Sequence, residues 1–94
     1  MDTQIVRAEI IANGLVQGVG FRYFVLHAAR ELKLKGFVQN LFTGEVLTVV
    51  EGPKLIVEEL FNKIKTGPRS AHVKNAVIKW LTNNNEFTDF EVRY

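Results

Sequence analysis

The glycine-rich stretch at residues 14–22 most constrains this chain, because it stands where an extended run must turn into a helix. Residues 5–11 alternate as in a strand, and residues 21–32 repeat apolar side chains at helical spacing. A glycine-rich turn of this kind exposes backbone N–H groups at the positive end of a helix dipole, which favours an anion. Arg22 can grip a phosphate through two N–H bonds. The stretch predicts either an anion site or a tight turn that needs glycine for positive φ.

The spacing of the glycines excludes the two best-known phosphate-binding loops. A Walker A loop needs Lys and then Ser or Thr after its last glycine, and no such pair follows Gly20. The dinucleotide fingerprint needs Gly-x-Gly-x-x-Gly, whereas Gly14, Gly18 and Gly20 are spaced four and then two positions apart. An anion site here would belong to another class of protein.

Apolar periodicity and turn residues divide the chain into strands and helices. We expect a helix that begins near Pro53 and stops at Gly67, with Val57, Leu60 and Ile64 on its apolar face. The other expected elements are a strand at 4–12, a helix at 21–33, strands at 35–42, 45–51 and 71–81, a polar loop at 82–86 and a strand at 87–94. This order predicts an α+β fold, a ferredoxin-like βαββαβ sandwich. Two helices would cover one face of a mostly antiparallel sheet with a short fifth strand.

The predicted topology places two distant polar residues at one edge of the sheet. The first strand runs up to the glycine-rich stretch, the helix runs down, and the second strand runs up again. Asn40 lies near the end of that second strand. We therefore expect Arg22 and Asn40 to lie close together.

Length and composition favour one soluble globular domain over residues 1–94. The net charge of +2 is too small to suggest a nucleic-acid partner. There is no cysteine for a disulfide or a thiolate metal site, no signal peptide and no apolar run of membrane-spanning length. We expect a cytoplasmic monomer with no membrane partner.

The glycine-rich stretch is part of a longer string that resembles the acylphosphatase family. Residues 16–22 read Val-Gln-Gly-Val-Gly-Phe-Arg, which looks like the first signature of that family. The second signature is matched in register by Gly36, Phe37, Val38, Asn40, Gly44, Val46 and Gly52. Residues 67–73 and 90–94 are also similar to the family. The chain departs from it at Ala12, where a larger aliphatic residue is usual, and at Leu15, where a basic residue is common.

The resemblance implies hydrolysis of acyl phosphates to a carboxylate and inorganic phosphate, without a metal or cofactor. The family's catalytic arginine and asparagine match Arg22 and Asn40. Inorganic phosphate would be the product and an inhibitor. The phosphate-binding residues implied by the match are Leu15, Val16, Gln17, Gly18, Val19, Gly20 and Phe21. An amide such as Asn40 can orient water but is not a strong base, so the leaving group must be good, as a carboxylate is.

Other polar and aromatic side chains are expected to be structural. His27 and His72 have no neighbouring ligands at metal-binding spacing. We expect solvated faces for the glutamates, a turn role for Thr43, strand packing for Trp80, and a place outside the site for the last two residues. These residues are Glu45, Glu51, Glu58, Glu59, Thr43, Trp80, Arg93 and Tyr94.

Two rival functions stay open at this point. The first is a non-catalytic acylphosphatase-like domain that binds phosphate or carbamoyl phosphate, as at the start of hydrogenase-maturation proteins. The length of 94 residues favours a free-standing enzyme over this domain. The second is an RNA-binding module of the same topology. Such modules stack bases on aromatic side chains of the central strands, and residues 4–12 and 45–51 contain no aromatic residue.

Overall fold

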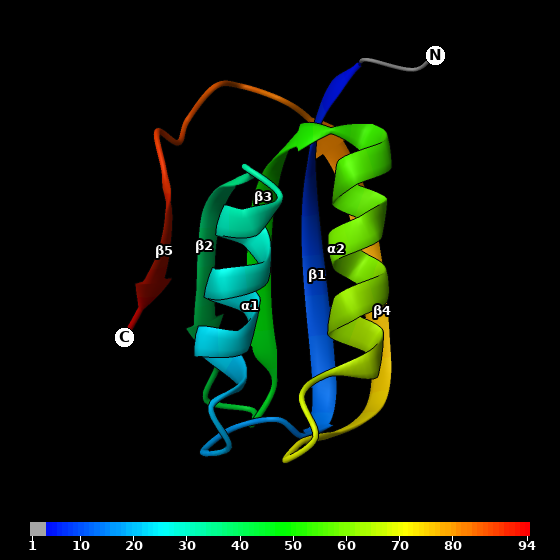
Figure 1. The fold of residues 1–94 in the computed structure, drawn as a ribbon, viewed down its shortest axis with the longest axis vertical. Coiled ribbons are helices and arrows are strands. Elements are labelled where there is room, and N and C mark those ends of the chain that lie inside the picture. The colour runs from blue at the N-terminus through cyan, green and yellow to red at the C-terminus, as the bar shows by residue number, and fades with distance from the viewer. Residues whose placement is uncertain (1–3) are drawn as a thin grey trace.

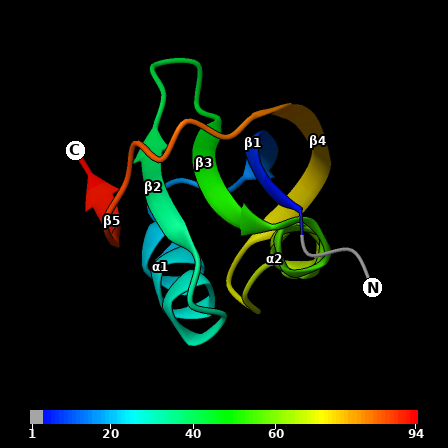
Figure 2. The same ribbon diagram turned by 90° about the horizontal axis from the view of Figure 1, so that it is seen from above.

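The structure, a computed structural model, describes residues 4–94 as a five-stranded sheet with two helices on one of its faces (Figures 1 and 2). The strand order is β4-β1-β3-β2-β5, and only β2 and β5 are parallel. The elements are β1 (Ile5–Leu15), α1 (Phe21–Glu31), β2 (Lys35–Asn40), β3 (Val46–Pro53), α2 (Lys54–Thr66), β4 (His72–Thr82) and β5 (Phe90–Arg93). The predicted ferredoxin-like α+β fold is confirmed, including the short fifth strand.

Side-chain alternation along β1 determines which face of the sheet packs on the helices. Val6, Ala8 and Ile10 are buried, as their spacing predicts, and the residues between them are only half-buried. Ala8 pairs with Val50 and Ile10 pairs with Thr48, so these two residues of β3 face the helices as well. The alternation of β3 is unclear because Val46, Leu47, Val49 and Val50 are all apolar, and its pairing with β1 fixes which residues face the helices.

Each helix buries one apolar stripe against the sheet. In α1 the predicted Phe21, Val25 and Ala29 are buried, and Leu32 is half-buried just beyond the helix end. In α2 the buried residues are the predicted Val57, Leu60 and Ile64. Gly67 ends α2 at a φ of 70°, a conformation that glycine adopts without strain. The stripes and the core face of the sheet form one apolar core.

The predicted end of the first strand at residue 12 is wrong, since β1 continues to Leu15. A register shift at Asn13 and Gly14 lets the chain go on pairing with β4, where Leu15 lies opposite His72. A Cβ at position 14 would lie 2.2 Å from the backbone oxygen of His72, and φ there is 121°. Gly14 therefore lies within the strand, where it allows a close approach of β1 and β4.

Several other predicted boundaries are too generous. The helix predicted to reach residue 33 ends at Glu31, because Lys33 takes a positive φ of 60°. The second strand ends at Asn40 and not at 42, because a turn follows in which the Gly44 amide donates to the Leu41 carbonyl. The last strand is confined to Phe90–Arg93.

The segment 83–89 crosses the sheet on the side away from the helices, between β4 and β5 (Figure 2). Its Phe87 packs edge-on against Phe37 of β2, with ring centroids 5.8 Å apart. Glu51, predicted on a solvated face, is buried beneath this segment with only 4% of its surface exposed. Its carboxylate accepts hydrogen bonds from the backbone amides of Asn84 and Glu86. The sequence prediction for Glu51 is wrong because the loop covers it.

Candidate active site

The loop between β1 and α1 forms a small cleft with the end of β2. The cleft holds about 90 Å³ and is lined by Val16, Gly18, Gly20, Phe21, Arg22, Tyr23 and Asn40. A single water needs only about 10–15 Å³ of such space, so a larger group has room there. Because β2 ends beside the start of α1, as Figure 1 shows, Arg22 and Asn40 line the same cleft. Of the residues expected to hold phosphate, Leu15, Gln17 and Val19 do not line it.

The N-terminus of α1 opens toward this cleft without a protein cap. Gly20 precedes the helix in the left-handed conformation, with φ of 75°, and among the described residues no side chain caps the helix. No acidic residue lies in its first turn. Gly18 has the same φ of 75°, and a Cβ at either glycine would meet nothing within 4 Å. Glycine is favoured at these two positions because of the positive φ and not because of close neighbours. The uncapped N–H groups at the start of α1 suit an anion.

Arg22 extends from the first turn of α1 and is held by the C-terminal end of the chain. One terminal nitrogen of Arg22 lies 3.4 Å from the carbonyl oxygen of Arg93, and its guanidinium carbon lies 4.7 Å from the centre of the Tyr94 ring. The Tyr94 hydroxyl is hydrogen-bonded to that of Tyr23, and this bond raises the pKa of the Tyr94 phenol. Within residues 4–94 no carboxylate pairs with Arg22.

The last two residues, predicted to lie outside the site, do not line the cleft, but both contact Arg22. β5 runs parallel to β2, so it carries Arg93 and Tyr94 to the end of the sheet where Asn40 lies. The sequence contained one usable signal, an aromatic residue at the end of the last predicted strand. The direction of that strand could not be read from its four residues.

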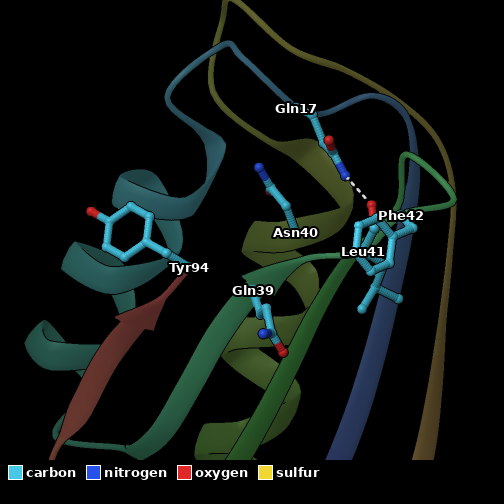
Figure 3. Close-up of a pocket in the computed structure, with 6 residues that line it drawn as sticks. All are labelled: Gln17, Gln39, Asn40, Leu41, Phe42 and Tyr94. Atoms are coloured by element: carbon cyan, nitrogen blue, oxygen red, sulfur yellow. Dashed lines mark hydrogen bonds between the residues drawn. The ribbon is translucent and has the colours of Figure 1, made fainter.

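Asn40 is the last residue of β2 and faces the helix side of the sheet, opposite Val46. Figure 3 shows its side chain rising from the strand between Gln17 and Tyr94. The Oδ1 atom is buried and has no hydrogen-bond partner among the described residues. A buried acceptor without a partner is unfavourable by about 1–3 kcal/mol, so a partner is expected in the working protein.

Gln17 lies in the loop, but its side chain turns toward the β2–β3 hairpin. Its Nε2 donates to the carbonyl oxygen of Leu41 at 2.8 Å, the bond drawn in Figure 3, and to that of Glu45 at 2.9 Å. It also lines a wider groove of about 470 Å³ beside the cleft, together with Gln39, Asn40, Leu41, Phe42 and Tyr94. The sequence predicts only a backbone role for Gln17, and nothing beyond the signature marks a role for its side chain.

The remaining candidates lie away from the cleft. His27 and His72 are exposed, and the Thr43 hydroxyl donates to Glu45 within the turn, at 2.8 Å. Trp80 is 38% exposed on edge strand β4, with the Lys54 ammonium 5.4 Å from its ring centre. Across residues 4–94, no group of three His, Cys, Asp or Glu side chains could hold a metal ion. The part of the chain that the structure describes contains no helix long and apolar enough to cross a membrane.

Fold and cleft together define a ferredoxin-like α+β protein in which an arginine, an amide and a glycine-rich loop face one small space. Residues 8–92 match the acylphosphatase family model. The chain is 44% identical to an acylphosphatase of Moorella thermoacetica over 95% of both chains. It is 39% identical to one of Pasteurella multocida over 96% of this chain and all of that protein. The chain belongs to the acylphosphatase family, and it is an enzyme of the hydrolase class.

Solved structures agree with this assignment. The crystal structure of acylphosphatase from Bacillus subtilis superposes with a TM-score of 0.91 at 32% identity, covering 95% of this chain and 99% of that one. The full-length HypF crystal structure, in a phosphate- and nucleotide-bound form, superposes with a TM-score of 0.88 at 32% identity. That match covers 98% of this chain but only 12% of HypF. The fold of this chain therefore occurs both in proteins of similar length and as a small part of a much longer protein.

Proposed function

We propose that this acylphosphatase cleaves the carboxyl–phosphate anhydride bond of an acyl phosphate by in-line attack of water on phosphorus. Arg22 and the loop at residues 15–21 hold the phosphoryl group, and Asn40 positions the water. The bridging oxygen leaves with the acyl group as a carboxylate, and the water oxygen becomes part of inorganic phosphate. No metal takes part in this scheme. The single observation that supports it best is that Arg22 and Asn40 line one cleft with the glycines of the loop.

The phosphoryl end of the substrate matches the charge of the cleft. The uncapped N-terminus of α1 and the guanidinium of Arg22, which no carboxylate of residues 4–94 neutralises, provide donors and positive charge on one side. In phosphoryl transfer, charge spreads over the equatorial oxygens of the transferring group. Donors fixed in advance around those oxygens stabilise the transition state more than they would in water.

Asn40 fits the position of the attacking water. An amide offers both a donor and an acceptor, and rotation by half a turn exchanges the two ends with little change in shape. Within residues 4–94 the buried Oδ1 has no partner, and a water at the rim of the cleft would satisfy one end of this amide. Since an amide is too weak a base to take the proton of water, the reaction depends on a good leaving group. A substrate phosphate oxygen is our candidate for accepting that proton.

The substrate class, a small acyl phosphate, follows from the family. Its acyl part stays unnamed, because a cleft that holds mainly the phosphoryl group discriminates weakly among acyl groups. We propose inorganic phosphate as product and competitive inhibitor, and a monomeric protein without nucleic-acid or membrane partners. The cytoplasmic location stays a prediction from the sequence.

A hydrolysis assay with a simple aromatic acyl phosphate such as benzoyl phosphate tests the proposal. We expect turnover that is the same with and without a strong chelator, and ¹⁸O from labelled water in the phosphate but not in the benzoate. Activity that chelator abolishes and added metal restores would contradict metal-free attack. Label in the benzoate would show attack at carbon. Phosphate binding without turnover would instead support the alternative of a non-catalytic acylphosphatase-like domain that binds phosphate or carbamoyl phosphate.

A further inference from the structure

Gln17 connects the two halves of the cleft. Asn40 belongs to β2, whereas Arg22 follows the loop that leaves β1. β1 pairs with β3 only as far as Ala12, and beyond that point it pairs with β4 alone as far as Leu15. The chain that enters the loop therefore follows β4, away from the β2–β3 hairpin.

Two hydrogen bonds from the side-chain amide of Gln17 connect the loop after β1 with the β2–β3 hairpin. Gln17 Nε2 donates to the carbonyl of Leu41, the residue after Asn40, and to that of Glu45, at 2.8 and 2.9 Å. Within residues 4–94, no other hydrogen bond joins loop residues 16–20 to residues 41–45. Figure 3 shows this amide beside Asn40, at the rim of the wider groove.

We propose that Gln17 is a positioning residue that fixes Asn40 relative to the phosphate-binding loop. This inference rests on the proposed role of Asn40. The side-chain amide of Gln17 carries two N–H donors on one nitrogen, which suits two carbonyls of a single turn. If attack is in line, a small displacement of the water matters, since misplacement of about 1 Å can reduce a rate about a hundredfold.

The hairpin can close without Gln17. The Glu45 carbonyl also accepts from the Leu41 amide at 2.8 Å, and the Leu41 carbonyl accepts from the Gly44 amide at 3.1 Å. Removing the Gln17 donors therefore leaves neither carbonyl without a partner. A variant without the Gln17 donors should keep the fold and lose only the hydrogen bonds between the loop and the hairpin.

The first test replaces Gln17 with methionine, which has similar length and no N–H donor. Gln17→Met should lower kcat about tenfold to a hundredfold while KM and the inhibition constant of phosphate change little. The matched control is Ser70→Ala. Ser70 holds the same loop by donating to the Val19 carbonyl at 2.8 Å, but from the α2–β4 connection. Ser70→Ala should change kcat by less than about threefold, because this exposed bond involves neither Asn40 nor the β2–β3 hairpin.

The second test asks whether Gln17 acts through Asn40. In an Asn40→Ala background, Gln17→Met should reduce kcat little further, because residues that act as a unit are not additive. An undiminished second loss, or a parallel weakening of phosphate binding, would overturn the proposal. So would equal effects of Gln17→Met and Ser70→Ala.

A third measurement separates failure of this inference from failure of the proposed mechanism. If Asn40→Ala is as active as the unchanged enzyme, Asn40 does not position the water. The NMR resonances of the Asn40 side-chain amide then decide the structural part. A shift in Gln17→Met that is absent in Ser70→Ala would show that Gln17 positions Asn40. No shift would overturn the positioning role itself.

Discussion

The two ends of the sheet differ in whether their buried polar atoms have hydrogen-bond partners. At the cleft end, the Oδ1 atoms of Asn13 and Asn40 are buried without hydrogen-bond partners among the described residues, and α1 begins without a side-chain cap. At the far end, the buried carboxylate of Glu51 accepts two backbone hydrogen bonds and lies 3.6 Å from the Arg7 guanidinium.

Arg7, at the far end, contacts a second carboxylate and an aromatic ring. It lies 2.7 Å from a carboxylate oxygen of Glu86, and its guanidinium carbon is 5.2 Å from the centre of the Phe87 ring. The hydrogen bond from Arg7 is the main cause that lowers the pKa of the Glu86 carboxyl. The charges of this end pair with opposite charges, whereas no carboxylate of residues 4–94 pairs with Arg22.

This contrast indicates that one end of the sheet contributes mainly to stability and the other mainly to function. Buried polar groups with partners stabilise the fold, and those without partners raise its energy unless a ligand or water completes them. We therefore expect substitutions at the far end to reduce stability and leave catalysis unchanged. Substitutions at the cleft end should do the reverse.

Arg22→Lys should have the largest effect. Lysine keeps the positive charge but not the planar pair of donors, so transition-state stabilisation should fall by about 2.7–4 kcal/mol, or about a hundredfold to a thousandfold in kcat. The melting temperature should barely change, since Arg22 makes one long hydrogen bond, at 3.4 Å. Steady-state kinetics and thermal melting of the same samples measure both quantities. Near-normal turnover would show that the two-pronged grip is not needed.

Glu51→Ala should have the next largest effect, on stability alone. It removes the acceptor of two backbone amides and a buried partner of Arg7, which should lower the free energy of unfolding by about 3 kcal/mol. For a domain of this size each kcal/mol corresponds to about 4–8 °C in melting temperature. The control is Glu59→Ala on the exposed side of α2, expected within about 0.5 kcal/mol of the unchanged protein. A stable but inactive Glu51→Ala variant would contradict the division between the two ends.

The fold was predictable because its signals are local and repeated. Alternation in β1 and the helical spacing of Phe21, Val25 and Ala29 gave the correct faces, and the signature strings gave the family. The strand directions that follow from this order bring Arg22 and Asn40 to one cleft. Their catalytic roles stay predictions.

The one wrong face, that of Glu51, and the contacts that the sequence did not predict all depend on segments far apart in the chain. Glu51 is buried only because the segment 83–89 folds back over it, and no periodicity in β3 marks that contact. Tyr94 reaches Arg22 because β5 runs parallel to β2, a direction that four residues cannot encode by pattern. The bonds of Gln17 span a sequence separation of 24 and 28 residues.

The smallest of these effects is the stabilisation of the folded protein by inorganic phosphate. It distinguishes most directly between variants at the two ends of the sheet. A ligand that binds only the folded state should add about 2.7 kcal/mol at a hundredfold excess over its dissociation constant. Sulfate should act similarly because of its shape and charge, and chloride at equal ionic strength should do less. A melting series in these salts, with a short single-stranded RNA added for the RNA-binding alternative, measures the order.

The same melting series on variants of the two ends tests whether only the cleft end binds phosphate. Glu51→Ala should melt lower in every salt but gain as much from phosphate as the unchanged protein, because its defect lies at the far end. Arg22→Ala should start near the normal melting temperature and lose most of the gain, whereas Asn40→Ala should keep it if Asn40 holds water and not phosphate. If phosphate stabilises Arg22→Ala fully, the anion does not bind beside Arg22. If RNA stabilises more than phosphate, the cleft end serves another ligand, although the contrast in buried polar atoms would still mark it as the functional end.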